Sequence, residues 1–328
     1  MGKELFRLIV TGDSLAQEAM KILSSKCRIT FTGAYPSPSF LAQKMREENA
    51  QALILRTGKA PAEVIKASPH LRVIAKHGVG VDNIDVETAT QLGIPVMITA
   101  SANYESVAEH TLGLMFALAK DIPWHDHRLR QGIWEKTKYR GVELFRKTLG
   151  LVGFGRIGRR VYELVSPLQM KVLVYDPYLT VENLPPDITL AAHLEDLLKE
   201  ADIVSLHCPL TEQTRHLIGK KELEAMKKTA WLINTARGEV VDEEALVSAL
   251  QEGKIAGAGL DTFKKEPPED LQLLCEAGKI VMTPHVAGAT EEAFQRMGIE
   301  AAQNVLAVLE GKKIDKNYLA NPEVLKFI

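Results

Sequence analysis

Three polar side chains whose types could do chemistry together follow three apolar runs in the second half of the chain. The runs lead into "INTARGEVVD" (233–242), "GLDTFKKEPP" (259–268) and "TPHVAGAT" (283–290), which supply Arg237, Glu266 and His285. Open α/β sheets bind ligands at the carboxyl ends of their parallel strands. We therefore expect these three side chains to share one cleft, with Asp261 beside them.

Together the three residue types suit hydride transfer. A carbonyl that accepts a hydride becomes an alkoxide and needs a proton, which histidine can supply near neutral pH. A carboxylate bonded to the imidazole orients it and keeps its protonated form available. An arginine can fork onto the carboxylate of a 2-keto acid and polarise the adjacent carbonyl. Each residue alone would more often be structural, so the prediction depends on their joint position at three strand ends.

A glycine-rich turn at 148–160, "TLGLVGFGRIGRR", predicts a dinucleotide site. Gly153 permits the tight turn off a strand, Gly155 lets the backbone approach a pyrophosphate, and Gly158 lets the following helix pack closely. The helix N-terminus favours phosphate. Asp176 ends the next apolar run, where a carboxylate would bind a ribose 2′-hydroxyl and repel a 2′-phosphate. The sequence therefore favours NAD over NADP.

The elements that must position these residues form two βαβ series, which predicts an α/β protein with two doubly wound parallel sheets. Strands are expected at 5–10, 52–57, 71–78 and 94–99 in the first series, and at 149–153, 171–176, 202–207, 230–234, 255–260 and 279–283 in the second. A helix is expected at 106–120, ended by Pro123, before a polar stretch with Trp124 and Trp134. The last long helix, 291–311, has no strands of its own and is expected to return to the first series. The domains are thus predicted as 1–100 plus 288–328, and 101–287 inserted between them.

Composition narrows the function classes. The 328 residues carry 40 basic and 42 acidic side chains, a net charge of −2, so no strong field would recruit nucleic acid or an anionic membrane. No apolar run approaches a membrane span, and the N-terminus does not resemble a secretory signal. Three cysteines without paired spacing predict free thiols in the cytoplasm. His125 and His127 lack a third ligand at metal spacing, so no metal is expected.

The quoted motifs, with "LHCPLTEQTRHLI", resemble those of the D-isomer-specific 2-hydroxyacid dehydrogenases, in order along nearly the whole chain. "GVGVDNIDVETATQLGIPV" and "SVAEHTLGLMFALAK" resemble more narrowly the phosphoglycerate dehydrogenase branch, here without its regulatory C-terminal domain. The resemblance implies a Rossmann NAD-binding domain inserted into a flavodoxin-like substrate domain, and a homodimer formed through the helix at 103–120 and the following arm. It implies His285 as the acid/base, Glu266 as its partner and Arg237 as the substrate-binding arginine.

The resemblance also implies the remaining contacts. Cofactor contacts are implied at Gly153, Gly155, Arg156, Ile157, Gly158, Asp176, Cys208, Thr235, Ala236, Arg237, Asp261, His285 and Gly288, with Asp261 on the nicotinamide carboxamide. Backbone amides of the loop Lys76-His77-Gly78-Val79-Gly80 would bind the substrate carboxylate, and Asn103 would lie near the same pocket. Lys76-His77 stand where the branch often has an arginine and a small residue.

Two questions stay open at this level. Arg56, Lys76 and His77, with Lys138 and Arg140 from a second subunit, could read an anionic tail on the substrate; equally, the protein could take a small acid such as glyoxylate or hydroxypyruvate. The protein could also be an NAD(H)-sensing binding protein of the corepressor type, which has the same architecture. Formate dehydrogenase chemistry replaces the glutamate of the acid/base pair with glutamine, so Glu266 argues against it.

Overall fold

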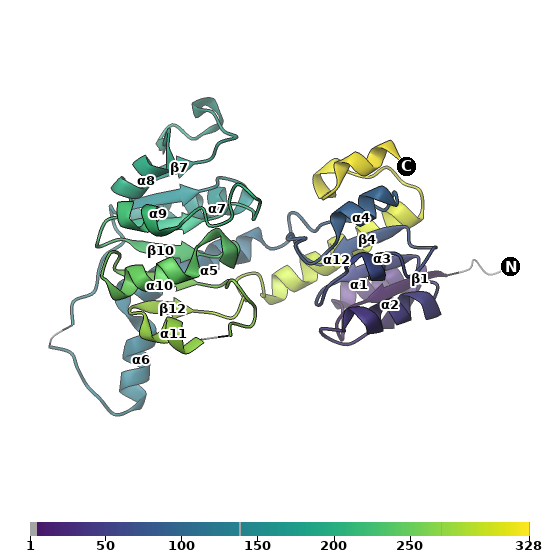
Figure 1. Cartoon of the computed structure of the whole chain (residues 1–328), viewed down its shortest axis with the longest axis horizontal. Helices are drawn as coiled ribbons and strands as arrows, with labels where there is room; N and C mark the ends of the chain where they lie inside the picture. The colour runs from purple at the N-terminus through teal and green to yellow at the C-terminus, as the bar shows by residue number, and fades with distance from the viewer. Residues whose placement is uncertain (1–4, 138, 270, 328) are drawn as a thin grey trace. The chain divides into compact units, whose positions relative to one another are not determined.

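The computed structural model describes residues 5–137, 139–269 and 271–327. The chain divides into two units, coloured along the sequence in Figure 1. Unit 1 comprises Met1–Asn103 together with Ala289–Ile328, and unit 2 comprises Tyr104–Gly288. One unit is therefore built from both ends of the chain, and the other is inserted between them.

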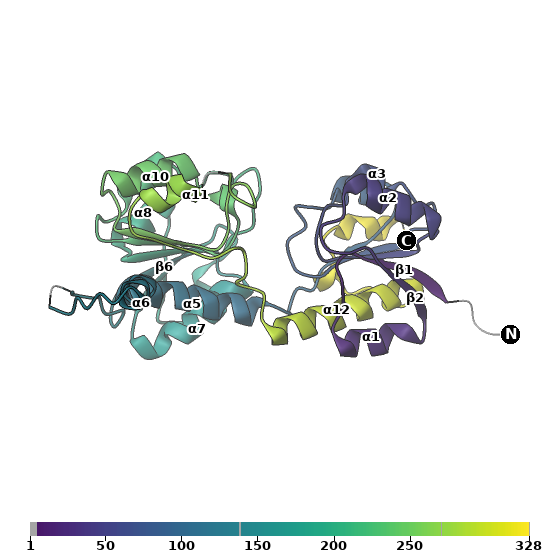
Figure 2. The same ribbon diagram turned by 90° about the horizontal axis from the view of Figure 1, so that it is seen from below.

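Unit 1 has a five-stranded parallel sheet among its described residues, in the order β2-β1-β3-β4-β5. This is the flavodoxin-like order. Its elements are β1 (Phe6–Val10), α1 (Gln17–Ser24), β2 (Cys27–Phe31), α2 (Pro38–Glu47), β3 (Ala52–Leu55), α3 (Ala62–Ile65), β4 (Val73–Lys76), α4 (Val86–Gln91), β5 (Val96–Met97) and α12 (Glu291–Leu309), followed by short 3₁₀ turns at Lys316–Tyr318 and Pro322–Lys326. In Figure 2, α1 and α12 cover one face of this sheet and α2 and α3 cover the other.

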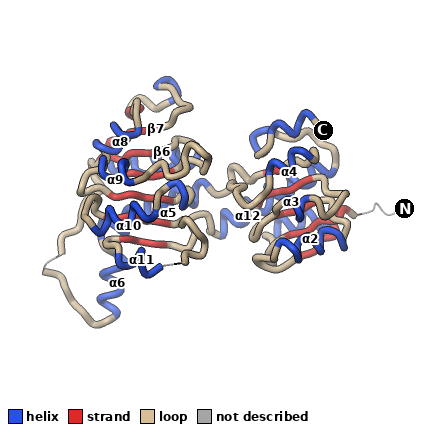
Figure 3. The backbone as a smooth tube through the Cα atoms, viewed as in Figure 1, coloured by secondary structure: helices blue, strands red, loops and turns tan. Residues whose placement is uncertain are grey.

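Unit 2 has a seven-stranded parallel sheet in its described part, in the order β12-β11-β10-β9-β6-β7-β8. Strand order reverses beside β6, as in the doubly wound dinucleotide-binding fold. The elements are α5 (Tyr104–Lys120), α6 (Ile122–Arg130), β6 (Thr148–Val152), α7 (Arg156–Val165), β7 (Lys171–Tyr175), β8 (Ile188–Leu190), α8 (Leu194–Glu200), β9 (Ile203–Leu206), α9 (Lys220–Ala225), β10 (Trp231–Asn234), α10 (Glu243–Gln251), β11 (Gly257–Leu260), α11 (Leu271–Glu276) and β12 (Ile280–Met282), with 3₁₀ turns at Ser166–Leu168, Val181–Asn183 and Gly238–Val240. The predicted α/β class with two parallel sheets is confirmed (Figure 3).

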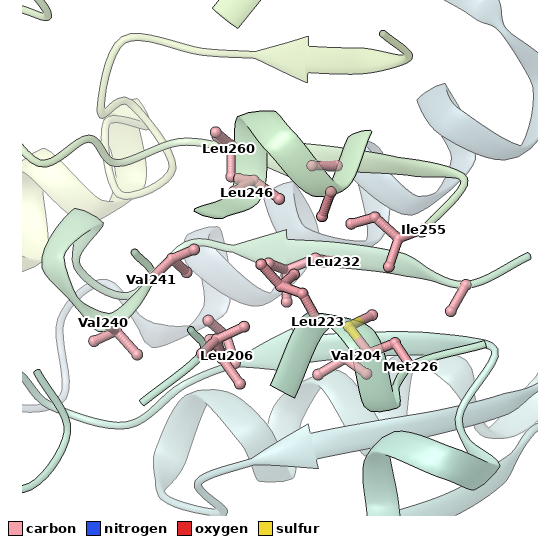
Figure 4. Packing of buried hydrophobic residues seen from close by; sticks show 14 of the residues in the cluster. Val204, Leu206, Leu223, Met226, Leu232, Val240, Val241, Leu246, Ile255 and Leu260 are labelled. Atoms are coloured by element: carbon pink, nitrogen blue, oxygen red, sulfur yellow. The ribbon is translucent and has the colours of Figure 1, made fainter. Parts of the chain in front are cut away.

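Helices cover both faces of the unit 2 sheet, which is why its strands are apolar almost without interruption. On one face, strand residues such as Val204 and Leu232 pack against Leu223 of α9 and Leu246 of α10 (Figure 4). On the other face, a second cluster joins α5 and α7 to the same strands. Burial of these side chains on both faces fixes the strands and therefore the positions at which they end.

The last long helix packs as expected. Ala301, Ala302 and Val305 of α12 are fully buried in the same cluster as Leu8 and Val10 of β1. This helix therefore packs on the sheet of unit 1, which contains the first βαβ series.

Three details of the predicted elements were wrong. The second series has a seventh strand, β8, and the first series has β2, which apolar runs alone did not predict. Both strands lie at an edge of their sheets, and in β2 only Cys27 is buried, so this strand is not apolar throughout. Pro123 does not begin an irregular stretch: α5 ends at Lys120, and Pro123 lies in the first turn of α6, where proline is favoured.

Candidate active site

The strands that carry the three predicted side chains end side by side. In the register of the sheet, Asn234 at the end of β10 pairs with Leu260 of β11, which pairs with Met282 of β12. Arg237, Glu266 and His285 lie in the loops that leave these three strand ends. The doubly wound topology thus brings to one edge of the sheet residues that are far apart in sequence.

His285 and Glu266 form a close pair. Nδ1 of His285 lies 2.7 Å from Oε2 of Glu266, and the backbone N–H of Phe263 donates to Oε1 at 3.2 Å. The two side chains are 45% and 39% exposed, so a small molecule can reach them. Because Nδ1 faces Glu266, Nε2 is the ring nitrogen that can exchange a proton with a bound molecule.

The charge of Glu266 follows from its surroundings. Burial raises the pKa of Glu266, but the hydrogen bond and the positive charge of His285 lower it. The N–H of Phe263 and the charge of Arg237 lower it further, so the pKa of Glu266 lies below its ordinary value. Glu266 is therefore a carboxylate at neutral pH.

The loop that carries His285 is held by Asp261. The backbone of His285 has φ of 54°, a left-handed conformation that a residue with a Cβ rarely adopts. The two following N–H groups, of Val286 and Ala287, donate to Oδ1 and Oδ2 of Asp261 at 2.9 Å each. Asp261 is completely buried at the end of β11. The structure thus gives Asp261 a loop-holding role that sequence spacing did not predict, and its contact with a nicotinamide carboxamide stays a prediction.

Arg237 leaves β10 through a short, well-bonded loop. Its carbonyl accepts from the side-chain amide of Asn234 at 2.9 Å, and its own Nη1 donates to the carbonyl of Ala236 at 2.7 Å. The guanidinium lies close enough to Glu266 to lower the pKa of that carboxyl. Arg237, Glu266 and His285 are therefore brought together within unit 2.

Gly238 allows the loop of Arg237 to meet the loop of Glu266. A Cβ built on Gly238 would lie 1.9 Å from the carbonyl carbon of Phe263, which is backbone and cannot move aside alone. We expect Gly238→Ala to lower the free energy of unfolding by about 3 kcal/mol or more, measured by thermal and denaturant melts. Gly113→Ala, in α5 where an added Cβ meets nothing within 4 Å, is the matched control. Equal stability of Gly238→Ala and the wild type would contradict the close packing of the two loops.

The glycine-rich turn has the shape that a dinucleotide needs. Gly153 has φ of 92°, and a Cβ there would lie 2.8 Å from the backbone nitrogen of Cys208. A Cβ on Gly158 would lie 2.5 Å from the carbonyl oxygen of Gly153. By contrast, a Cβ on Gly155, the residue before α7, would meet nothing within 4 Å. The first and third glycines are thus required by packing, while the second borders open space at a helix N-terminus, where a pyrophosphate fits.

Asp176 lies directly beside this turn. Its Oδ2 accepts from the backbone N–H of Phe154 at 3.0 Å, and its Oδ1 accepts from that of Tyr178 at 3.0 Å. Phe154 is the residue between the first two glycines of the motif. The carboxylate is therefore held against the glycine turn, and its contact with a ribose stays a prediction.

The other predicted cofactor residues lie around the same strand ends of unit 2. Arg156 and Ile157 open α7, Thr235 and Ala236 follow β10, and Gly288 is the last residue of the unit. The hydroxyl of Thr235 lies 3.0 Å from that of Thr111 on α5. Burial raises the pKa of Cys208 to about 11, so its thiol is neutral and unsuited to act as a nucleophile.

The predicted substrate residues of unit 1 form a second group. The guanidinium of Arg56 lies 5.0 Å from the ring centroid of Phe294, and Nζ of Lys76 donates to Asn83 at 3.1 Å. His77 is 9% exposed, and its Nε2 has no hydrogen-bond partner in the described residues. Burial, and then the charges of Arg56 and Lys76, lower the pKa of His77 to about 3. The three residues thus make a cationic cluster around a neutral imidazole.

The rest of the predicted set is placed as follows. Gly78 has φ of 145° and exchanges hydrogen bonds with Thr99, Val79 is 41% exposed, Gly80 follows it, and Asn103 is the last residue before α5. Arg140 donates to the carbonyl of Tyr139 in its own segment. Lys138 lies outside the described residues. Phe294, from the far end of the chain, joins the Arg56 cluster without any signal in the sequence pattern.

Two further kinds of feature are absent from the described residues. No cluster of three or more His, Cys, Asp or Glu side chains there is arranged to bind a metal ion. No helix in the described part of the chain has both the length and the apolar character to cross a membrane.

Comparison with known proteins gives a consistent picture. The family model "D-isomer specific 2-hydroxyacid dehydrogenase, NAD binding domain" matches residues 112–287. The chain is 39% identical to D-3-phosphoglycerate dehydrogenase of Methanocaldococcus jannaschii, over 98% of this chain and 60% of that protein. It is 46% identical to glyoxylate reductase of Thermofilum pendens, over 89% of this chain and 86% of that protein. The crystal structure of D-lactate dehydrogenase from Aquifex aeolicus, complexed with NAD and lactic acid, matches with a TM-score of 0.81 at 32% identity, covering 93% and 96% of the two chains.

The parallel-stranded fold, the glycine turn and these similarities define a dinucleotide-dependent oxidoreductase class. The chain belongs to the D-isomer specific 2-hydroxyacid dehydrogenase family, and residues 112–287 form its NAD-binding domain. The predicted family is therefore confirmed.

Proposed function

We propose that this protein transfers a hydride between NAD(H) and a D-2-hydroxy acid, or in reverse its 2-keto acid. The observation that carries the proposal is the His285–Glu266 pair, joined at 2.7 Å beside Arg237 at three adjacent strand ends. Bound NAD would supply the hydride acceptor or donor. Unit 2 then holds the cofactor, and unit 1 is the substrate domain.

The proposed acid/base is His285. In the reduction direction its Nε2 donates a proton to the alkoxide oxygen, and in oxidation it removes that proton. Glu266, charged at neutral pH, accepts the hydrogen bond of Nδ1 and stabilises the protonated ring. This mechanism requires Nδ1 to bond to Glu266 while Nε2 faces the substrate. The 2.7 Å contact between Nδ1 and Glu266 supports that arrangement.

Substrate recognition is proposed to rest on a planar cation and on backbone amides. Arg237 would fork onto the carboxylate of the acid and polarise the neighbouring carbonyl. In unit 1, the loop Lys76-His77-Gly78-Val79-Gly80 is proposed to offer backbone amides to the substrate, and Asn103 is assigned to the substrate as well. The amides proposed are those of Val79 and Gly80, because the N–H of Gly78 already donates to the hydroxyl of Thr99 at 2.9 Å.

The cofactor residues are proposed as the sequence predicts them. They are Gly153, Gly155, Arg156, Ile157, Gly158, Asp176, Cys208, Thr235, Ala236, Arg237, Asp261, His285 and Gly288. The space beside Gly155 and the carboxylate of Asp176 against the turn support the pyrophosphate and ribose assignments.

Asp176 should set the choice between NADH and NADPH. Replacement by asparagine keeps an oxygen that can accept the hydrogen bond from Phe154 but removes the negative charge. We expect Asp176→Asn to raise the ratio of kcat/KM for NADPH over NADH by about 10–100-fold, since a 2′-phosphate no longer faces a like charge. Steady-state kinetics with both cofactors measure the ratio, and Asp187→Asn is the control on the surface of the same unit. An unchanged ratio would remove Asp176 from cofactor selection.

For the substrate, an anionic tail is proposed. Arg56 and Lys76 flank the buried ring of His77, and such a cationic cluster suits a phosphate, a sulfonate or a second carboxylate. The measurement is kcat/KM for 3-phosphohydroxypyruvate against hydroxypyruvate, with an expected preference of at least about tenfold for the former. Arg56→Gln should abolish this preference. Equal values in the wild type would leave a small acid such as glyoxylate or hydroxypyruvate as the substrate.

The direct test of the activity is loss of NADH absorbance with a panel of 2-keto acids. Turnover with any of them supports the enzyme, and tight NADH binding without turnover would instead support a sensor of the corepressor type. An assay with formate and NAD tests formate dehydrogenase chemistry, which Glu266 argues against.

A homodimer and a cytoplasmic location are also proposed. Four large apolar side chains, Ile122, Trp124, Leu129 and Trp134, lie on α6 and the arm after it and are 54–77% exposed in the single chain. A second copy that covers them would explain this exposure. Cys27, Cys208 and Cys275 are free thiols, which suits a reducing compartment.

A further inference from the structure

A polar chain of three side chains runs behind the loop of His285. The hydroxyl of Thr283 lies 2.6 Å from Oδ1 of Asp261, to which it donates. Nε2 of His110, on α5, lies 2.9 Å from the same hydroxyl oxygen and 3.6 Å from Oδ1 of Asp261. Because the hydroxyl gives its hydrogen to the carboxylate, its oxygen accepts the hydrogen of His110 Nε2. A long helix is thereby connected to the buried end of β11.

The same carboxylate holds the backbone on both sides of the proposed acid/base. Thr283 precedes His285 by two residues, and Val286 and Ala287 follow it; all three donate to Asp261 at 2.6–2.9 Å. Between these anchors, His285 has φ of 54°. A non-glycine residue keeps such a conformation only where the surrounding structure over-determines it. The anchors on Asp261 supply that constraint.

We infer that Thr283, supported by His110, is a positioning residue for His285. The inference rests on the proposed role of His285 in hydride transfer. The carboxylate of Asp261 is fully buried, so the loss of one donor leaves a buried charge short of a partner. Rotation of the carboxylate toward another donor displaces the amides of Val286 and Ala287. The ring of His285 then leaves the position from which Nε2 meets the alkoxide oxygen.

The threonine hydroxyl can be removed with little change of shape. Thr283→Val keeps the two branches at Cβ but cannot donate to Asp261, whereas Thr283→Ser keeps the hydroxyl. We expect Thr283→Val to lower kcat by about 10–100-fold with KM within about twofold, because a misplaced acid affects the proton transfer and not the substrate contacts. Thr283→Ser should restore kcat to within about threefold of the wild type.

A neighbouring threonine provides the matched control. Thr262 lies two residues after the end of β11 and is 1% exposed, and its hydroxyl has no hydrogen-bond partner in the described residues. Thr262→Val should therefore leave kcat unchanged. His110→Leu removes the more distant member of the chain and should lower kcat by about threefold to tenfold, less than Thr283→Val. Thermal melts show whether each variant is folded at the assay temperature.

Hydrogen exchange of the loop provides a readout that does not need turnover. In the wild type the amides of Val286 and Ala287 are bonded to Asp261, and Thr283→Val should raise their exchange by about tenfold or more, whereas Thr262→Val should not. Wild-type kcat in Thr283→Val, or unchanged exchange in its loop, would overturn the inference. If the wild type reduces no 2-keto acid, the proposed function falls, and the exchange result alone then decides whether Thr283 holds this loop.

Discussion

Replacement of His285 by glutamine is expected to lower kcat for 2-keto acid reduction by about 10²–10⁴-fold, the contribution of a positioned general acid. Glutamine has an amide that can still meet Glu266, but it has no group that takes up and releases a proton near neutral pH. KM should change little, because the substrate carboxylate is assigned to Arg237, and the affinity for NADH should fall by no more than about threefold, because His285 is only one of thirteen proposed cofactor contacts. Steady-state kinetics and NADH fluorescence titration measure these quantities.

A surface histidine of the same unit provides the control. His193 is exposed at the residue before α8, and His193→Gln should match the wild type in every kinetic constant. If His285→Gln retained more than about a tenth of the wild-type kcat, proton transfer by this residue would be excluded, whatever the fold and the cofactor site.

The Glu266 carboxylate determines how the rate depends on pH. Its pKa lies below the ordinary glutamate value, so the ion pair contributes stability above that ordinary value and loses it as the pH falls through the lowered pKa. Protonation of Glu266 removes the negative charge that Nδ1 of His285 meets at 2.7 Å, so the rate should fall as the pH drops below the ordinary glutamate range. In Glu266→Gln no carboxylate remains to be protonated, and we expect kcat at neutral pH to be lower by about tenfold and this fall at acid pH to disappear. Glu269→Gln, which alters an exposed pair with Lys265, should leave the profile in place.

The strand ends explain why so much of the site could be predicted from sequence. Arg237, Glu266 and His285 each follow an apolar run, and runs of that kind are buried parallel strands whose carboxyl ends share an edge. This prediction did not require the full order of strands in the sheet. It required only that the three strands lie near one another. The glycine turn was predictable for a similar local reason, since the requirements at Gly153 and Gly158 arise within the motif itself.

The features of the site that could not be predicted depend on contacts between residues that no regular sequence spacing relates. Asp261 bonds to Thr283, Val286 and Ala287, and His110 reaches Thr283 from another helix; no periodicity in the sequence indicates either contact. The ring of Phe294 under Arg56 depends on how α12 folds back onto unit 1. The edge strand β8 was not predicted for a different reason. It has only three residues, which are too few to form a recognisable apolar run.

Replacement of Arg237 by lysine is expected to lower kcat/KM for a 2-keto acid by about 10²–10³-fold. Lysine keeps the positive charge but loses the planar pair of N–H groups that matches a carboxylate. Removing one partner of a desolvated, hydrogen-bonded charge pair costs about 2–5 kcal/mol, and each 1.4 kcal/mol is about tenfold in rate. Both constants should change, KM upward because the carboxylate is bound less well, and kcat downward because the carbonyl is less polarised.

A variant of Arg215 is the control for the Arg237→Lys variant. It shows whether the loss of any arginine near this loop lowers kcat/KM. Arg215 pairs with Glu239, two residues beyond Arg237, and both side chains are well exposed. A surface ion pair contributes about 1 kcal/mol or less, so Arg215→Gln should lower kcat/KM by no more than about fivefold. If Arg237→Lys and Arg215→Gln gave equal values, the guanidinium of Arg237 would be a structural cation. Substrate binding would then have to rest on backbone amides alone, and the proposed preference for a 2-keto acid would lose its side-chain basis.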